Sequence, residues 1–283
     1  MDLSDVIPPR DYEFRMGLRR GDPADFFRAT AAHAEIAAER TRWLAEDAAR
    51  YAGLTPGGEP LVEELAHLFA DWNASPTPEE GAGRTVAAES PWEMLLHLGR
   101  VMEPDILLLS RGTEGPMILR AACVFFPSSW RPEEKFGQPM DFIHEPAPGL
   151  NRDLGAQIDT FLSRLQPGVG WLRNNWGLSA SPERNQHPDR QLPRLDGDAE
   201  LDRTWLRVER QCLVALPSRS GVLFGLRIES HRLDHVVSES PGAALRLAHA
   251  LHTMDAAIAH YKGLAAARGK IIARLEEIDP PAR

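Results

Sequence analysis

Cysteine is scarce in this sequence, since only Cys123 and Cys212 occur among 283 residues. Two cysteines cannot build a disulfide framework or a four-cysteine metal site. They are also too few to hold an iron–sulfur cluster. The simplest interpretation is a protein of a reducing compartment, and we therefore expect a cytoplasmic location.

Basic residues are fewer than acidic ones, and long apolar runs are absent from the sequence. The chain has 32 Lys and Arg against 41 Asp and Glu, a formal charge of 32 − 41 = −9. This excess of acid argues against a nucleic-acid-binding surface. No run approaches the ~20 apolar residues that cross a bilayer. The acidic start, Met1–Asp5, lacks the basic and apolar regions of a signal peptide. We expect neither nucleic acid nor a membrane as a partner.

Several catalytic motifs are missing as well. The sequence contains no GxGxxG, GxxxxGK[ST], HExxH or GxSxG pattern. Dinucleotide-binding, phosphate-loop, zinc-protease and serine-hydrolase functions therefore lose their usual support. With 43% hydrophobic and 26% charged residues, the composition is that of an ordinary globular protein with length for a sizeable core.

The apolar pattern that is present predicts both helices and strands. Apolar residues recur at three- and four-residue spacing in five segments that we expect to be helices: 22–52, 59–72, 90–102, 150–165 and 240–275. Shorter runs rich in Val, Phe, Trp and Leu predict strands at 106–109, 117–126, 171–178, 205–216 and 221–229. The polar segment 179–203 predicts a long excursion over the surface. This order predicts an α+β fold in which helices pack on an antiparallel sheet.

The most informative stretch is 121–149, which changes from a strand to a histidine flanked by prolines. Its apolar run ends at Pro127, because proline cannot donate to a sheet ladder. Near its end, Pro146 and Pro148 favour extended, stiff backbone around the Ile143-His144-Glu145 sequence. We expect His144 to be held on a non-helical segment and aimed at a partner.

This stretch carries a family resemblance. The sequence FFPSSWRPEEKFGQPMDFIHEPAPG resembles the PS-W-x(4)-K-x-G…IH-x-P-x-PG signature of the heme-dependent oxidative N-demethylase alpha subunits. Two later blocks agree with it. RNNW at 173–176 resembles R-x-NW, and the sequence from Arg207 to Arg227 resembles RVERQ-x-L…LP…G-x-x-LF-x-I-R.

The resemblance implies a PAS-like antiparallel sheet that holds heme b. Because the sequence has no CxxCH motif, any heme would be bound without covalent attachment. The implied division is a helical segment at 1–104 packed on the core, a PAS-like heme-binding sheet domain at 105–238 and C-terminal helices at 239–283, together forming one compact unit. The implied activity is oxygen-dependent removal of a methyl group from a small amine, which releases formaldehyde.

The resemblance also selects candidate residues. His144 is the candidate axial ligand of the heme iron, since histidine is a common proximal ligand. The candidate cofactor-binding residues are the cations and aromatic residues of the matching blocks: Lys135, Arg173, Trp176, Arg210, Phe224 and Arg227. Asp105 and Glu145 are the nearest carboxylates and could attract an ammonium group.

Each of these residues also has an ordinary structural interpretation. Alternation along 205–216 places Arg207, Glu209 and Gln211 on one face and Arg210 on the other, and such charges commonly form surface ion pairs. The tryptophans could be core residues, and Asp105 and Glu145 could be cap or turn residues.

Three functions stay open at this point. The first is an oxidative N-demethylase that draws electrons from a separate flavin and iron–sulfur reductase, with a small amine and dioxygen as substrates. The second is another heme-dependent reaction, such as N-oxygenation or oxidation of a natural-product intermediate, because a fold does not settle its function. The third is a non-catalytic PAS-type sensor of heme or a small molecule.

Overall fold

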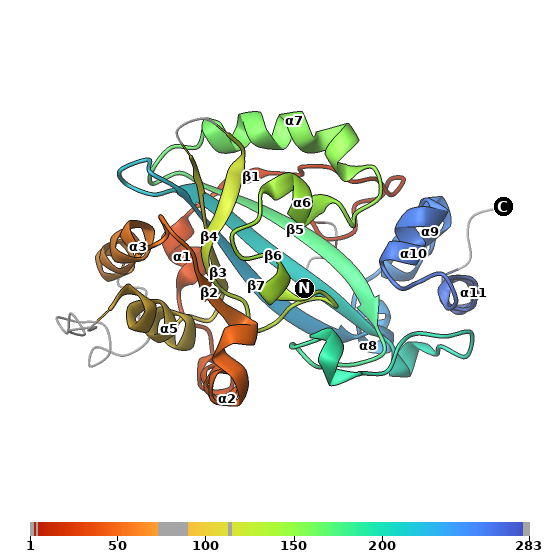
Figure 1. The fold of residues 1–283 in the computed structure, drawn as a ribbon. Helices are drawn as coiled ribbons and strands as arrows, with labels where there is room; N and C mark the ends of the chain where they lie inside the picture. The colour runs from red at the N-terminus through yellow and green to blue at the C-terminus, as the bar shows by residue number, and fades with distance from the viewer. Residues whose placement is uncertain (1–2, 4, 73–89, 113–114, 280–283) are drawn as a thin grey trace.

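One antiparallel sheet organises the computed structural model, which describes Leu3 and residues 5–72, 90–112 and 115–279. Its strand order is β1-β5-β6-β7-β3-β4-β2 (Figure 1). The strands are β1 (Arg19–Gly21), β2 (Ala52–Leu54), β3 (Asp105–Arg111), β4 (Met117–Cys123), β5 (Gly170–Ser179), β6 (Trp205–Ala215) and β7 (Val222–Arg232). The predicted α+β class with a central antiparallel sheet is confirmed.

Helices α6 (Met140–His144) and α7 (Leu150–Ser163) lie against one face of the sheet, here called the α7 face (Figure 1). Leu162 and Leu165 pack there against Leu107 and Leu109 of β3. Strand residues on this face are partly exposed where the helices do not reach, and they include Trp171, Leu213 and Phe224. The α7 face is therefore apolar under α7 and open farther along the strands.

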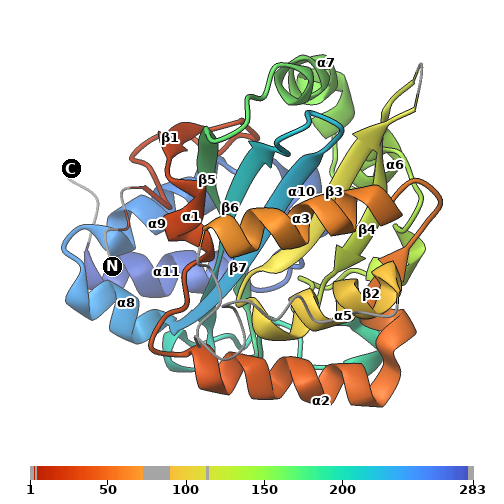
Figure 2. The ribbon, with the colours of Figure 1, turned by 90° about the vertical axis from the view of Figure 1, so that its left-hand side faces the viewer.

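The N-terminal helices cover part of the opposite face (Figure 2). They are α1 (Pro23–Phe27), α2 (His33–Tyr51), α3 (Glu59–Asp71) and α5 (Pro91–Val101). Leu61, Leu65 and Leu95 from these helices pack against Leu108 and Leu223 of the sheet. The helix predicted at 22–52 is wrong in its continuity, because the backbone leaves the helical conformation at Arg28.

The C-terminal helices cover the rest of that face: α8 (Leu233–Glu239), α9 (Ala243–Thr253), α10 (Ala256–Tyr261) and α11 (Arg268–Ile278). The single helix predicted at 240–275 is therefore wrong. Met254 is extended, and Asp255 caps a new helix by accepting a hydrogen bond from the N–H of Ala257. Gly263, with φ of +69°, then lies between α10 and α11. None of the described helices has the length and hydrophobicity needed to cross a membrane.

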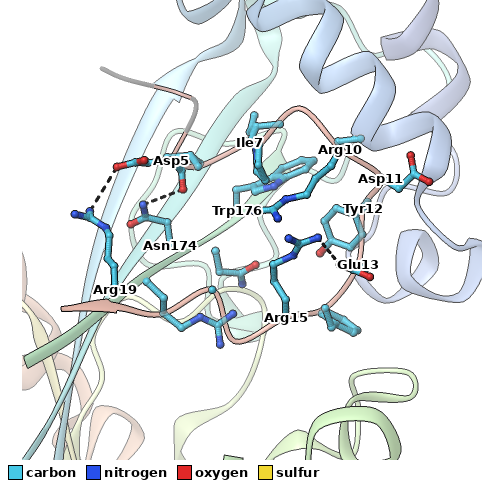
Figure 3. A pocket seen from close by; sticks show the side chains of 17 residues that line it. Asp5, Ile7, Arg10, Asp11, Tyr12, Glu13, Arg15, Arg19, Asn174 and Trp176 are labelled. Atoms are coloured by element: carbon cyan, nitrogen blue, oxygen red, sulfur yellow. Dashed lines mark hydrogen bonds and ion pairs between the residues drawn. The ribbon is translucent and has the colours of Figure 1, made fainter.

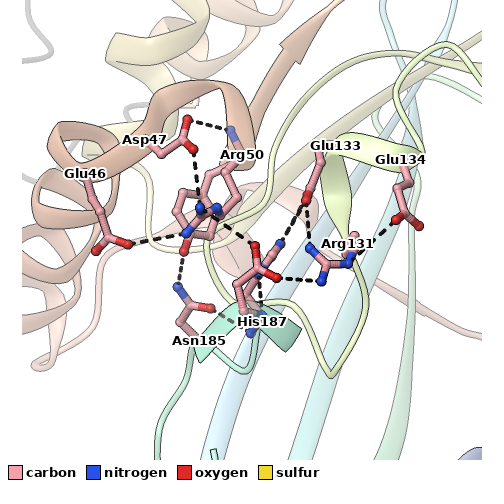
Figure 4. A network of polar contacts seen from close by, with 10 residues as sticks. Glu46, Asp47, Arg50, Arg131, Glu133, Glu134, Asn185 and His187 are labelled. Carbon is pink, nitrogen blue, oxygen red and sulfur yellow. Dashed lines mark hydrogen bonds and ion pairs between the residues drawn. The ribbon is translucent and has the colours of Figure 1, made fainter. Parts of the chain in front are cut away.

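The excursion between β5 and β6 is fastened to the body by polar contacts around His187 (Figure 4). The Nε2 atom of buried His187 lies 3.2 Å from both carboxylate oxygens of Glu133, and its Nδ1 accepts from the N–H of Asp189. Asp189 forms ion pairs with Arg131 at 2.5 Å and with Arg50 at 3.8 Å. The polar segment predicted at 179–203 as a surface excursion thus makes fixed, partly buried contacts with the rest of the protein.

Candidate functional site

His144 is the last residue of the short helix α6, so the prediction that it lies on a non-helical segment is wrong. Pro139 precedes the helix with φ of −73°, and the segment Met140–His144 contains no proline. Pro146 and Pro148 act only after His144, where they stop the helix from continuing. The chain then turns at Gly149, which has φ of +76°, and enters α7. The prolines end the helix and do not exclude it.

The imidazole of His144 is half-buried and electrostatically suited to remain neutral. Burial lowers its pKa below the ordinary value, and the nearby Arg173 cation lowers it further. Within the described part of the chain, no hydrogen bond is made by the ring. A neutral imidazole offers a nitrogen lone pair, which is the form that binds a metal ion.

Arg173 on β5 is a half-buried cation that forms no direct ion pair with a described residue, although the charge of Glu209 acts on it. Its register partner is Gln211 on β6, and both side chains lie on the α7 face. The guanidinium forms no hydrogen bond or ion pair with any described residue, and its Nε is fully buried. Burial lowers the pKa of Arg173, while the charge of Glu209 opposes that shift. A buried Nε–H without an acceptor is unfavourable, so this position favours an anionic ligand that can accept from the guanidinium.

Replacing Arg173 by glutamine is expected to raise the pKa of His144 toward its ordinary value near 6.5, because the substitution removes a neighbouring positive charge. An NMR titration of the His144 ring protons measures this shift. Arg210→Gln is the matched control, because Arg210 lies on the opposite face of the sheet. Equal shifts in the two variants would contradict the proximity of Arg173 to His144.

The lowered pKa of His144 also determines how the stability of the fold depends on pH. Because the pKa of His144 is lower in the folded than in the unfolded chain, the unfolded chain takes up the proton first as pH falls. His144 therefore disfavours folding as pH drops below about 6.5, and this loss is complete below the folded pKa. Arg173→Gln should bring the folded and unfolded pKa values of His144 closer together, so that the pH range over which stability is lost becomes narrower.

A buried carboxylate, Glu209, lies on the same face. It accepts hydrogen bonds from Ser128 at 2.6 Å, Asn175 at 3.0 Å and Gln211 at 3.2 Å. Burial alone would raise the pKa of Glu209, but these hydrogen bonds and the charges of Arg207 and Lys262 lower it overall. Glu209 is therefore a fixed negative charge on the α7 face.

Lys262 and Tyr12 complete this polar group, and sequence reasoning missed both. Burial lowers the pKa of Lys262 to about 8, although the charge of Glu209 opposes the shift. Its Nζ donates to the carbonyl of Trp176 at 2.6 Å and lies 5.7 Å from the centre of the Tyr12 ring. Burial raises the pKa of Tyr12, so its phenol stays protonated. Neither residue belongs to a regular strand pattern, so no periodicity could have placed it here.

Three of the predicted cofactor-binding residues lie on the opposite face of the sheet from Arg173. Strand register places Trp176, Arg210 and Arg227 there. Arg210 pairs with Glu229 at 2.5 Å, and Arg227 pairs with the buried Glu103. The structure therefore does not bring them to His144, and the two arginines have structural partners.

The other predicted residues differ in their surroundings. Phe224 lies on the α7 face beside Leu213. The ammonium of Lys135 is 4.7 Å from the ring centre of Phe142, which precedes His144 by two residues on α6. Glu145 is exposed directly after α6. Phe224, Lys135 and Glu145 thus remain on the His144 side of the molecule.

Asp105, by contrast, is completely enclosed. It accepts from Arg40 at 3.0 Å and from the backbone N–H groups of Phe125 at 3.0 Å and Phe126 at 3.1 Å. Because both oxygens are occupied and the residue has 0% exposure, the structure gives Asp105 a structural role and no route to a substrate.

A cavity of about 240 Å³ lies where the N-terminal arm, residues 5–18, passes the open edge of β5 (Figure 3). Its lining includes Arg173 from β5, and Tyr12 packs there edge-on against Trp176 with ring centres 5.7 Å apart. The arm is anchored by the N–H of Tyr12, which donates to Thr253 at 2.9 Å, and by Asp11, which lies 2.8 Å from Nε2 of His249. The cavity thus adjoins Arg173 and the polar group.

The sequence as a whole matches a known protein family. The family model described as "Haem-dependent oxidative N-demethylase, alpha subunit-like" matches residues 17–272, which include His144, Arg173 and Glu209. Within the described residues, no group of three or more His, Cys, Asp or Glu side chains is placed to hold a metal ion. Since the match covers most of the chain, this protein belongs to the haem-dependent oxidative N-demethylase alpha subunit-like family.

Proposed function

We propose that this chain binds heme b without a covalent bond and uses it to oxidise an amine, with removal of an N-methyl group as formaldehyde as the leading reaction. The observation that carries the proposal is the pair formed by His144 and Arg173. An imidazole without a hydrogen bond among the described residues stands near a half-buried guanidinium that forms no ion pair with them and whose Nε atom is buried without a partner.

These residues fit the chemical groups of a heme. An iron porphyrin needs only one or two axial protein ligands, so the single imidazole of His144 is a sufficient donor. A heme also carries two propionates, and arginine and lysine are the side chains that bind such carboxylates. Arg173 is the nearest candidate, and Lys135 is the second. Phe224 offers an apolar wall on the same face, consistent with a PAS-like heme-binding sheet.

When bound, the heme supplies the oxygen-dependent redox chemistry, and the protein supplies position and charge. His144 binds the iron and orients it. Arg173 would pair with a propionate, and in the heme-free chain its charge favours the neutral imidazole of His144. Glu145, which is exposed beside His144, is the candidate group for attracting an ammonium substrate.

Electrons would come from a separate reductase. Cys123 and Cys212 are both buried, and burial raises the pKa of each to about 12, so they remain neutral thiols. Such thiols are poor metal ligands. A flavin or iron–sulfur partner is therefore part of the proposal.

The proposal is tested by adding hemin to the purified protein, recording the absorption spectrum and measuring formaldehyde from dimethylamine in the presence of an electron donor. We expect stoichiometric heme uptake and formaldehyde release. Heme uptake with an oxygenated amine product would favour N-oxygenation, and uptake without any turnover would favour a sensor. Absence of heme uptake would refute the proposal.

A further inference from the structure

The cavity between the N-terminal arm and β5, here called the arm cavity, is lined by more positive charge than its own carboxylates neutralise. Four arginines line it: Arg10, Arg15, Arg19 and Arg173. Its three carboxylates are each engaged with a different partner: Glu13 with Arg15, Asp5 with Arg19 at 3.8 Å, and Asp11 with His249 at 2.8 Å. Arg10 and Arg173 have no anionic partner among the described residues. Two unmatched guanidinium groups therefore face one small space.

The side chains converge on the cavity from both of its walls. Figure 3 shows Arg10 and Arg15 extending from the arm toward Trp176 and Tyr12. Guanidinium groups repel one another unless an anion lies between them, and their planar donors match a carboxylate. The aromatic rings give the cavity an apolar side, so the expected ligand has a carboxylate and a short apolar or cationic remainder.

The size of the cavity limits what it can hold. Its volume of about 240 Å³ is below the ~300–1,000 Å³ typical of pockets for drug-sized ligands. It equals the liquid volume of about eight water molecules at ~30 Å³ each. A small metabolite fits these limits, whereas a porphyrin macrocycle does not.

The cavity shares one residue, Arg173, with the proposed heme site, but its other cations come from a different part of the chain. Arg173 belongs to both, since it lines the cavity and its charge acts on His144. Arg10, Tyr12 and Arg15, however, precede the segment 17–272 that matches the family. If a heme propionate neutralises Arg173, the charge of Arg10 still lacks a partner. Because Arg10 is exposed and lines the cavity without an ion-pair partner among the described residues, it is available to a second anionic group, and the arm is the element that would recognise it.

We propose that the arm cavity binds the carboxylate of the amine substrate through Arg10, assisted by Arg15, so that the enzyme prefers an N-methylated amino acid to a simple alkylamine such as dimethylamine. This inference rests on the proposed function. The amine end of such a substrate would point from the arm toward the α7 face, where Glu209 supplies a fixed negative charge.

The test compares N-methylglycine with N-methylglycinamide, which has the same shape but no carboxylate. Binding of each is measured by calorimetry to heme-free and heme-loaded protein. We expect the acid to bind at least about tenfold more tightly than the amide, as a charge-assisted hydrogen bond predicts. Arg10→Gln should weaken binding of the acid about tenfold and leave binding of the amide unchanged. Arg152→Gln, an exposed arginine on α7 outside the cavity, is the matched control and should change neither.

Three results would overturn the inference. The acid and the amide could bind equally or not at all, Arg152→Gln could weaken binding as much as Arg10→Gln, or heme loading could displace the acid. Displacement of the acid by heme would indicate that the heme propionates, and not a substrate carboxylate, occupy the cavity. The first two of these results can be obtained with heme-free protein and are therefore independent of heme uptake, which tests the proposed function itself.

Discussion

Replacing His144 by alanine is expected to weaken heme binding by at least about 100-fold. Loss of a residue that only orients a metal ligand already costs 10–100-fold in metal affinity, and His144 is the proposed ligand itself. Within the described residues, its ring makes no hydrogen bond and its pKa lies below the ordinary value, so the substitution removes no other known contact. Titration with hemin, followed in the Soret region of the absorption spectrum, measures the affinity and the change of ligand together.

The control for this experiment is His252→Ala. His252 is an exposed histidine of α9, so the same substitution there should leave heme binding and the position of the Soret band unchanged. Unfolding of both variants in urea checks that neither has lost its structure. An unaltered spectrum in folded His144→Ala protein would show that another residue binds the iron.

Replacing Asp105 by alanine is expected to reduce the free energy of unfolding by about 3–5 kcal/mol, the usual cost of removing one partner of a buried ion pair. Asp105 and Arg40 both have 0% exposure. The substitution leaves the Arg40 guanidinium uncompensated and removes the acceptor of two backbone N–H groups, those of Phe125 and Phe126. Since whole domains are stable by only about 5–15 kcal/mol, urea denaturation should detect a large shift in the midpoint.

Two further variants test whether the loss of stability comes from the buried pair Arg40 and Asp105 or would follow from removing any carboxylate. Asp153→Ala removes an exposed partner of Arg152, and such pairs add little to stability. The double variant Arg40→Met, Asp105→Leu replaces both buried charges by apolar groups and should lose less stability than the sum of the single substitutions. A small effect of Asp105→Ala, similar to that of Asp153→Ala, would contradict the structural role of this pair.

The sheet could be predicted from the sequence where apolar alternation was strong. The hairpin predicted at 205–216 and 221–229 corresponds to β6 and β7, and alternation correctly placed Arg210 on the face opposite Glu209. The helix predicted at 90–102 corresponds to α5, whose first turn is capped by the hydroxyl of Ser90, which accepts from the N–H of Glu93. The three-residue strands β1 and β2 were missed, because so short a segment has no periodicity.

The site was harder to predict because its parts come from elements without a common pattern. Sequence reasoning placed His144 and Arg173 among the candidates, but it could not tell that Arg210 and Arg227 lie on the other face. That distinction depends on the register of β6 with β5, and an irregular excursion of 25 residues, 180–204, separates these two strands in the chain. Tyr12 and Lys262 were missed because they reach the site by tertiary packing of the arm and α10.

The two short edge strands have a consequence for how the chain completes its fold. β1 and β2 come from the first 54 residues, yet they pair with β5 and β4, which are synthesised later. Arg19, for example, lies opposite Leu172. Such distant pairing carries a large loop-closure entropy and forms late in folding. Until it forms, β4 and β5 are the two edge strands of the sheet, and each exposes one row of unpaired backbone groups. The nascent protein therefore depends on its earliest residues for protection against aggregation.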